Sequence, residues 1–520
     1  MRAALFAFAV LFAAGTHGQT CVPPQQSTVV AYPSGTIIAG VGTSDIPVTT
    51  KSEKCKNLVK QGFALIHCFW FNEAVRSFRD ATKLDPGCAI AWCGLNVAEN
   101  MPWNKRAEYT QEAEYAIKMA VRLWETAGPL EQELIIAFRT RDLRLDDRNG
   151  AFNAAMKELI SRHPDDIEPR LLLAGIRTQI CMNDRTLPSG VVQNELIETA
   201  ALIEPILAKD PKNPGALHYK IHAFEGSRPE MALAAARLLG TVAPASAHMV
   251  HMPGHIFNVL GLWDEADKAF AESSRLGKEY AKAVGTGPGE ADWNFGHNED
   301  YWGVNFGEQG RLKEAMAHAG PRKNEILWRL GDWKALAKEV EKADESEGAL
   351  YYRGMAAANL GHLGTAKECR DKLLKIDGTN RGNVGKMVLK TRQLELEGLV
   401  YVKSNEVNDG LEKLQDAVKA YALIEYEEPP YFMRPPHETL GQVFTDLGRY
   451  KEAVSVFQDG LKVKRNAGTM LFGIARAYEA GGEQAKARTA YNDFLRVWAK
   501  ADEDRPQVVH AKNFLANLKN

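Results

Sequence analysis

Residues 260–270 read LGLWDEADKAF and residues 447–457 read LGRYKEAVSVF, so the two stretches agree position by position in residue class. The same step from alanine to phenylalanine four residues later recurs at Ala74 and Phe78. A glycine stands twelve positions before the key alanine in several units, at Gly62, Gly254, Gly354 and Gly441. From Ala453 to Ala487 the step is 34 residues. The chain therefore repeats one short structural unit.

The unit is helical. Apolar residues recur at three- and four-residue spacing between Gly, Pro and Asn punctuation, and alternation typical of strands is almost absent after residue 50. A helix-turn-helix unit of 34 residues with small residues at the helix contact resembles the tetratricopeptide repeat, over most of residues 55–500. The resemblance implies an all-α solenoid, a right-handed superhelix whose concave side is lined by the first helix of each repeat.

We expect four regions in the chain. They are a signal peptide at residues 1–18, an irregular tail at 19–50, an N-terminal array at 51–320 and a C-terminal array at 321–520. Residues 3–14 are apolar, follow Arg2 and precede small and polar residues, which is typical of a cleaved secretory signal and too short to span a bilayer. An uncleaved anchor is the alternative. Prolines bar a helix at residues 427–436, and further loops are expected near 183–192 and 283–292.

Composition excludes several classes of protein. Of the 520 residues 45% are hydrophobic and the net charge is -2, so neither disorder nor attraction to nucleic acid or an anionic membrane is indicated. Seven cysteines without a C-x-x-C pair do not predict a thiolate zinc site. One or two disulfide bridges among Cys55, Cys68, Cys88 and Cys93 are expected from the secreted location.

Histidines suggest chemistry. Six of the thirteen lie in four short strings around residues 66–70, 218–222, 251–255 and 297–301. Two of the strings are H-x-x-x-H, a spacing that places both imidazoles on one face of a helix. The candidate metal ligands are His67, His218, His222, His251, His255 and His297.

The repeat register brings these residues to one side. With Ala74, Ala266 and Ala315 at repeat position 20, the resemblance implies that His67, His251, His255, His297 and Asp300 face the concave groove. The register of His218 and His222 depends on the loop at residues 227–230. His248 is out of phase with His251 in this register, so we expect it to orient a ligand from outside or to lie on the surface.

Three further residues are candidates for catalysis, Glu225, Asp300 and Tyr301. Glu225 lies three positions beyond His222 on the same helical face and would be a ligand or a base. Asp300, or Glu299, would be a carboxylate ligand, and Asp300 could instead orient a histidine. Tyr301 would line the pocket. Glu73 is more simply explained as a helix-capping or surface acid.

The ligand types restrict the metal. Imidazole and carboxylate without thiolate suit copper, zinc, iron or nickel. Neither histidine pair reads H-E-x-x-H, which disfavours a zinc protease of that type. Six imidazoles divide into two groups of three, each with one H-x-x-x-H pair and one single histidine, as in the dicopper sites of proteins similar to hemocyanin and tyrosinase. Copper is therefore favoured, and a single zinc or iron remains an alternative.

Longer strings resemble a group of exported bacterial tetratricopeptide-repeat proteins. They are GFALIHCFWFNEA at 62–74, DPGCAIAWCG at 85–94, PGALHYKIHA at 214–223, HMVHMPGHIFNVLGLW at 248–263 and HNEDY at 297–301. Cys68 and Gly254 stand where the group has serine, and neither change removes a candidate ligand. The resemblance supports the choice of site residues and implies no particular reaction.

Two hypotheses of function follow. The first is a secreted metalloenzyme, an oxidoreductase of copper type, that acts on a small or peptide-borne substrate in the concave groove; a zinc or iron hydrolase or lyase is its variant. The second is a non-enzymatic scaffold that binds a peptide or protein in that groove. Metal storage or transport without turnover is a third possibility.

Overall fold

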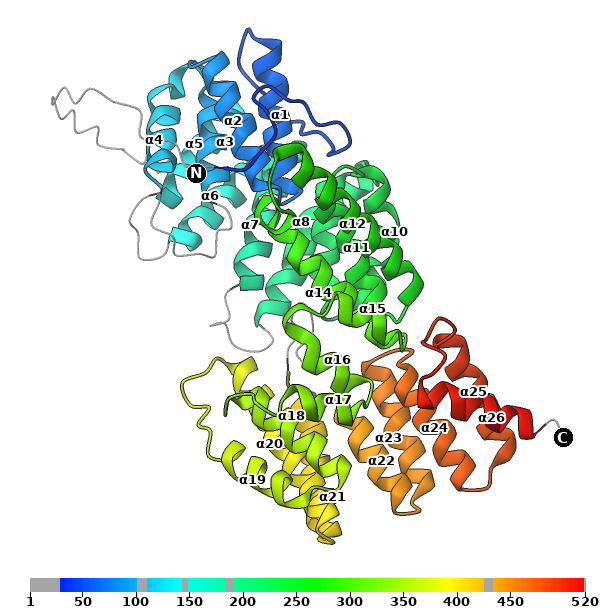
Figure 1. The fold of residues 1–520 in the computed structure, drawn as a ribbon. Helices are drawn as coiled ribbons and strands as arrows, with labels where there is room; N and C mark the ends of the chain where they lie inside the picture. Colours follow the sequence, from blue (N-terminus) through cyan, green and yellow to red (C-terminus); the bar gives the residue numbers. More distant parts are fainter. Residues whose placement is uncertain (1–28, 101–109, 143–147, 184–190, 425–433, 519–520) are drawn as a thin grey trace, which may run out of the picture.

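A computed structural model describes residues 29–100, 110–142, 148–183, 191–424 and 434–518, and Figure 1 shows their fold. All regular secondary structure in these residues is helical, with no strand among them. The all-α, tetratricopeptide-type solenoid predicted from the repeat pattern is confirmed.

The N-terminal helices are α1 Glu53–His67, α2 Phe71–Leu84, α3 Ala89–Glu99, α4 Gln111–Arg122, α5 Pro129–Asp142, α6 Arg148–Arg162, α7 Glu168–Asn183, α8 Val191–Lys209, α9 Pro214–Phe224, α10 Leu233–Val242, α11 Ala247–Val259, α12 Trp263–Val284, α13 Pro288–Ala291, α14 Trp293–Glu308 and α15 Leu312–Ala317. The C-terminal helices are α16 Lys323–Arg329, α17 Trp333–Glu339, α18 Glu347–Leu360, α19 Leu363–Leu373, α20 Asn383–Lys403, α21 Val407–Tyr421, α22 His437–Asp446, α23 Tyr450–Val463, α24 Gly468–Ala480, α25 Gln484–Val497 and α26 Pro506–Asn517. Short 3-10 helices are η1 Trp124–Thr126, η2 Pro229–Ala232 and η3 Gly320–Arg322.

Glycine-to-aromatic contacts hold the helix pairs together. Phe78 of α2 lies between Gly62 and Gly94, where an added Cβ would be 2.5 Å and 2.1 Å from its ring. Phe270 meets Gly254 in the same way, with a Cβ at 2.3 Å. Because glycine has no side chain, the aromatic ring packs directly against the backbone of the facing helix. The helices can therefore approach closely. The glycines of the sequence repeat are therefore packing positions.

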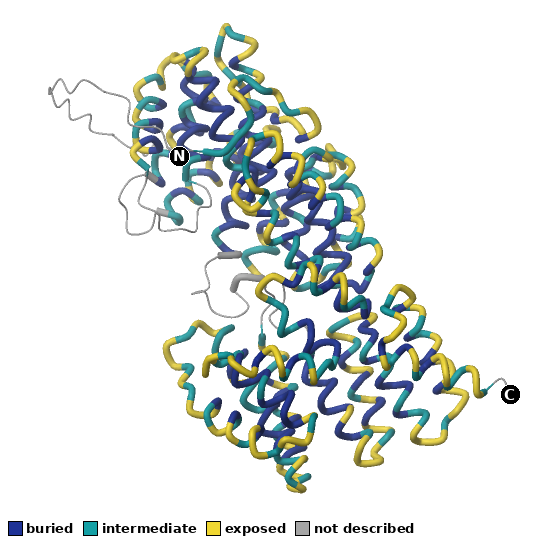
Figure 2. Tube along the Cα trace, in the orientation of Figure 1, coloured by how far each residue is buried: buried dark blue, intermediate teal, exposed yellow. Residues whose placement is uncertain are grey.

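The described residues form two large apolar cores and a smaller cluster that contains Phe69 and Tyr219. The two large cores divide the molecule. One contains buried residues from Val41 to Tyr301 and the other contains buried residues from Val304 to Ala511, so the division falls within α14. Figures 1 and 2 show the corresponding halves, each with a buried interior. The C-terminal repeats fold back on α12 and α14: Trp263 Nε1 donates to Asn466 O over 3.1 Å and Trp498 Nε1 donates to Glu308 O over 2.8 Å. The expected domain division at residue 320 falls in η3 and remains a prediction.

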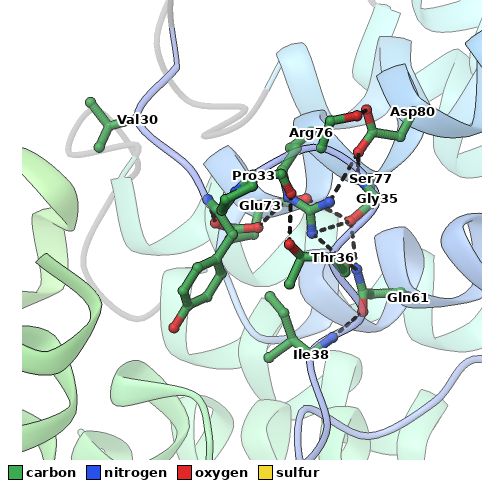
Figure 3. A network of polar contacts seen from close by, with 12 residues as sticks. Val30, Pro33, Gly35, Thr36, Ile38, Gln61, Glu73, Arg76, Ser77 and Asp80 are labelled. Carbon is green, nitrogen blue, oxygen red and sulfur yellow. Dashed lines mark hydrogen bonds and ion pairs between the residues drawn. The ribbon is translucent and has the colours of Figure 1, made fainter. Parts of the chain in front are cut away.

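The described part of the N-terminal tail is irregular but packed (Figure 3). Its backbone donates from Tyr32 N to Glu73 Oε1 over 2.6 Å and from Gly35 N to Asp80 Oδ2 over 2.7 Å. Arg76 joins the two acids and donates to Thr36 O over 2.9 Å. Glu73 lies in the first turn of α2 but is fully buried, so the surface position that we expected as one possibility is wrong.

The tail and α2 also contact elements that lie far along the chain. Tyr280 of α12 donates to Glu73 Oε1 over 2.9 Å, and Ala245 N, before α11, donates to Gly40 O over 3.0 Å. Helix α1 also packs against α7 and α9. Segments far apart in the sequence therefore meet near α9 and α11.

Several sequence predictions lie outside the described residues. These are the signal peptide at 1–18, the start of the tail and most of the proline-rich segment at 427–436. Cys55, Cys68, Cys88 and Cys93 are buried free thiols in the structure, so it does not contain the bridges we expected among them. Among the described helices, none combines the length and apolar character needed to cross a membrane.

Substitution Gly94→Ala should destabilise the N-terminal array by about 1–3 kcal/mol, because the new methyl group would overlap the Phe78 ring. The measurement is the thermal unfolding midpoint. Gly364→Ala is the control, since a Cβ at Gly364 meets nothing within 4 Å. Equal midpoints for the two variants would contradict this account of helix packing.

Candidate metal centre

The clustered histidines lie on α9, α11 and α14, and each of these helices begins at an N-cap residue whose side chain accepts a hydrogen bond from the first turn. Asn213 accepts from Ala216 N at the start of α9, with Pro214 in the first turn. Ser246 accepts from Met249 N at the start of α11. Asp292 accepts from Asn294 N at the start of α14. These caps fix where each helix starts, and therefore which residues face the neighbouring helices.

Helix α11 packs between α9 and α14, and the histidines of the three helices form two triads. The first triad is His218, His222 and His248, and the second triad is His251, His255 and His297. Within each triad, one potential ligand atom from each residue lies within 4.8 Å of the others. All six are buried except His297, which is partly exposed.

The ring nitrogens within a triad approach closely. His218 Nε2 lies 3.1 Å from His222 Nε2 and 3.1 Å from His248 Nε2. In the second triad, His255 Nε2 lies 2.7 Å from His251 Nε2. The two triads adjoin, since the centroids of the His248 and His251 rings are 6.1 Å apart.

His248 is the residue that sequence reasoning misplaced. We expected it outside the ligand set, yet it completes the first triad and is buried. The spacing from His248 to His251 and to His255 is i, i+3 and i+7, which places the three on one stripe of α11. That spacing was the available signal, and the repeat register alone concealed it.

Glu225 fixes the proton position on one histidine of each triad. Its Oε1 lies 2.9 Å from His222 Nδ1 and its Oε2 lies 2.8 Å from His255 Nδ1. Glu225 and both imidazoles are buried. A carboxylate only accepts hydrogen bonds, so both Nδ1 atoms carry the proton and both Nε2 atoms present a lone pair.

Two asparagines of α14, which our sequence reasoning did not select, act in the same way on α11. Asn298 Oδ1 lies 2.9 Å from His251 Nδ1, and its amide nitrogen donates to the backbone oxygen of Phe270, which fixes the orientation of the amide. Asn294 Oδ1 lies 3.0 Å from His248 Nδ1. Both Nδ1 atoms therefore donate, and their Nε2 atoms again present lone pairs.

His218 is fixed by a backbone carbonyl. Its Nδ1 lies 2.7 Å from His67 O, an acceptor that carries no proton. Five imidazoles thus direct Nε2 lone pairs into the two triads. Two Nε2 atoms that are 2.7–3.1 Å apart and both carry lone pairs repel each other unless a proton or a metal ion lies between them.

Protonation of the triads is opposed by their surroundings. Burial, followed by the neighbouring imidazoles, lowers the pKa of His218, His251 and His255 well below the usual value. Burial likewise lowers the pKa of His248 to about 3 and that of His297 to about 4. These five histidines are therefore neutral at pH 7, the state in which imidazole binds metals.

The spacing fits a metal ion. Three nitrogens at about 2.0–2.1 Å from a tetrahedral ion lie about 3.3–3.4 Å from one another. Three of the observed separations are 2.7–3.1 Å and the others are at most 4.8 Å, so small movements of the rings would reach this spacing. The arrangement of a ligand histidine whose other nitrogen donates to an oxygen is also the usual one in metal sites.

Aromatic side chains surround the triads. The Phe69 ring stacks on His222 and His248, with centroids 5.8 Å and 5.5 Å away, and its backbone has a φ of 55°. Such a conformation costs about 1 kcal/mol or more in a bulky residue and is often retained at functional sites. The Tyr301 ring stacks on His255 at 4.3 Å. Trp293, 52% exposed, contacts His248 and His297 at the solvent edge.

The structure brings most predicted site residues together. His218, His222, His251, His255 and His297 lie in the triads, with Glu225 and Tyr301 in contact with them.

Three predicted residues lie elsewhere. His67 is outside the triads, with Nδ1 bonded to the Tyr219 hydroxyl at 2.8 Å and Nε2 to Glu168 at 2.8 Å. Asp300 accepts from Arg322 over 2.9 Å. Glu299 accepts from His318 over 2.8 Å.

Residues 439–506 match the family model of the tetratricopeptide repeat. Solved structures similar to this chain include the APC/C hetero-tetramer Cut9–Hcn1, at 15% identity over 90% of this chain and 76% of that chain, with a TM-score of 0.29. Yeast Tom70 is similar at 13% identity over 90% and 96%, with a TM-score of 0.28. The human IFIT1 dimer with PPP-AAAA is similar at 12% identity over 85% and 89%, with a TM-score of 0.32. A comparison with curated proteins found no match.

Substitution His67→Ala should lower the free energy of unfolding by about 1–3 kcal/mol, because it removes the partner of the buried Glu168 and Tyr219 groups. It should leave bound metal unchanged, since the carbonyl that accepts from His218 belongs to the backbone. Unfolding curves and elemental analysis measure the two effects. Loss of metal from a folded variant would contradict the position of His67 outside the triads.

Proposed function

We propose that this tetratricopeptide-type protein binds two transition-metal ions, one in each histidine triad, and uses them in catalysis. The observation that carries the proposal is the convergence of six imidazoles, five of which donate outward from Nδ1. Five buried Nε2 lone pairs face one another at short range in an environment that opposes protonation. A divalent or monovalent cation relieves this repulsion.

Copper is the metal that we favour, and zinc or iron would also bind. Each triad supplies three imidazoles, and neither contains a carboxylate or thiolate among the described residues. Such ligands suit copper and zinc better than magnesium or calcium. Two adjacent three-histidine sites exceed what one catalytic zinc requires.

The reaction that we propose is oxidation of a small or peptide-borne substrate with dioxygen as the oxidant. The bound metals would supply the redox chemistry. The chain's own residues exclude water and hold the imidazoles: Phe69 covers the first triad and Tyr301 packs against the second. A substrate would approach at Trp293 and His297, which form the exposed edge of the cluster.

The candidate catalytic roles change accordingly. Both Glu225 oxygens accept from histidines, which supports an orienting role in place of a general base. The Asp300 carboxylate pairs with Arg322 and so favours a structural role. A zinc or iron hydrolase or lyase remains the variant of this proposal, and it would use one triad and leave the adjoining one unexplained.

A peptide- or protein-binding scaffold is the second candidate. It is favoured by the tetratricopeptide match at residues 439–506, in the C-terminal repeats and away from the triads. The two functions are compatible, since the C-terminal array could bind the protein that carries the substrate. The apolar segment at residues 3–14 supports secretion as the location.

Protein purified without a His-tag should contain about two copper ions per chain, measured by plasma mass spectrometry. His218→Ala/His222→Ala and His251→Ala/His255→Ala should each lose the ion of one triad, because each change removes two of three ligands. The control is His163→Ala, which removes a surface histidine paired with Glu133. No metal in folded wild type, even after reconstitution with copper, zinc and iron, would refute the proposal.

Copper-loaded protein should consume dioxygen when supplied with phenols or tyrosine-containing peptides. Both double variants should lose this activity, because both triads adjoin one reaction site. An oxygen electrode measures the rate. Two bound copper ions without dioxygen uptake on any substrate would indicate storage or transport instead.

A further inference from the structure

We propose that Glu225 is a positioning residue that ties the two metal sites together, so that one carboxylate sets the binding competence of both triads. The inference rests on the proposed function. It goes further by assigning to one side chain the link between the sites.

The geometry of Glu225 is symmetrical with respect to the triads. It is the C-cap residue of α9, three residues beyond His222. Its Oε1 accepts from His222 of the first triad over 2.9 Å, and its Oε2 accepts from His255 of the second triad over 2.8 Å. The side chain is only 3% exposed, so water does not replace it as an acceptor.

The proton positions on two ligands depend on this group. Each imidazole presents an Nε2 lone pair to its triad only while its Nδ1 atom carries the proton. The carboxylate accepts both protons at once, which no neutral side chain of the same shape does. The other Nδ1 acceptors, Asn294, Asn298 and His67 O, each serve a single histidine.

The carboxylate also contributes charge. Two cations bound by six neutral imidazoles would place several positive charges in a buried space, and a negative group between the triads offsets part of that charge. Glu225 supplies a carboxylate to one imidazole of each triad. Its position between one ligand of each triad lets it act on both ions.

Substitution Glu225→Gln separates this role from simple packing. The amide has the same shape but only one accepting oxygen, and its nitrogen donates. One histidine keeps its Nδ1 proton and remains a ligand. The other faces an N–H group and must move its proton to Nε2, so its triad loses a ligand.

The experiment measures copper per chain by plasma mass spectrometry, and the affinity of each site by titration against a copper chelator. Wild type should bind two ions, whereas Glu225→Gln should keep one and bind the other 10–100-fold more weakly. The matched control is Glu133→Gln, in which the changed carboxylate also bonds a histidine, His163, outside the triads. This control should retain two ions of unchanged affinity.

The outcomes are separable. Two ions of wild-type affinity in Glu225→Gln would overturn the role of Glu225 and leave the proposed metal sites standing. No metal in wild type would overturn the proposed function itself. If Glu225→Gln does not fold, Glu225→Asp keeps both oxygens but shortens the reach by one methylene group, and it should likewise lose one ion.

Discussion

The structure depends on the close approach of neighbouring helices. An aromatic ring of one helix packs against a glycine of the next, where no side chain keeps the helices apart. Phe78 against Gly62 and Gly94, and Phe270 against Gly254, set the helix spacing in the N-terminal array. With that spacing, α11 packs between α9 and α14. The residues on the facing sides of these helices are therefore in contact.

The histidines between these helices are polar and mostly buried. Burial of polar groups is unfavourable unless each group has a hydrogen-bond partner or a ligand. The imidazoles are held by acceptors on their outer nitrogens: Glu225, Asn294, Asn298 and the carbonyl of His67. Their inner nitrogens face one another. A metal ion would resolve this conflict between burial and repulsion, which is why we place the proposed chemistry here.

The N-terminal segment changes how the groove of this solenoid is understood. Residues 32–42 bond to α2 and to the loop before α11, so the chain's own backbone occupies part of the space between them. These bonds tie the elements around α11 together, which suits a site that must hold six imidazoles in place. Peptide recognition is then more naturally a property of the C-terminal repeats, where the tetratricopeptide match lies.

The sequence by itself determined the helical repeat and five of the six clustered histidines, because both depend on spacing along the chain, which a helix converts into direction. Tertiary structure decided the rest. In the folded protein His248 belongs to a triad and His67 lies outside both triads. Asp300 accepts a hydrogen bond from Arg322, and Glu225 accepts from two histidines. These outcomes depend on the twist between helices and on competition among buried partners, which three-dimensional packing sets and no local spacing encodes.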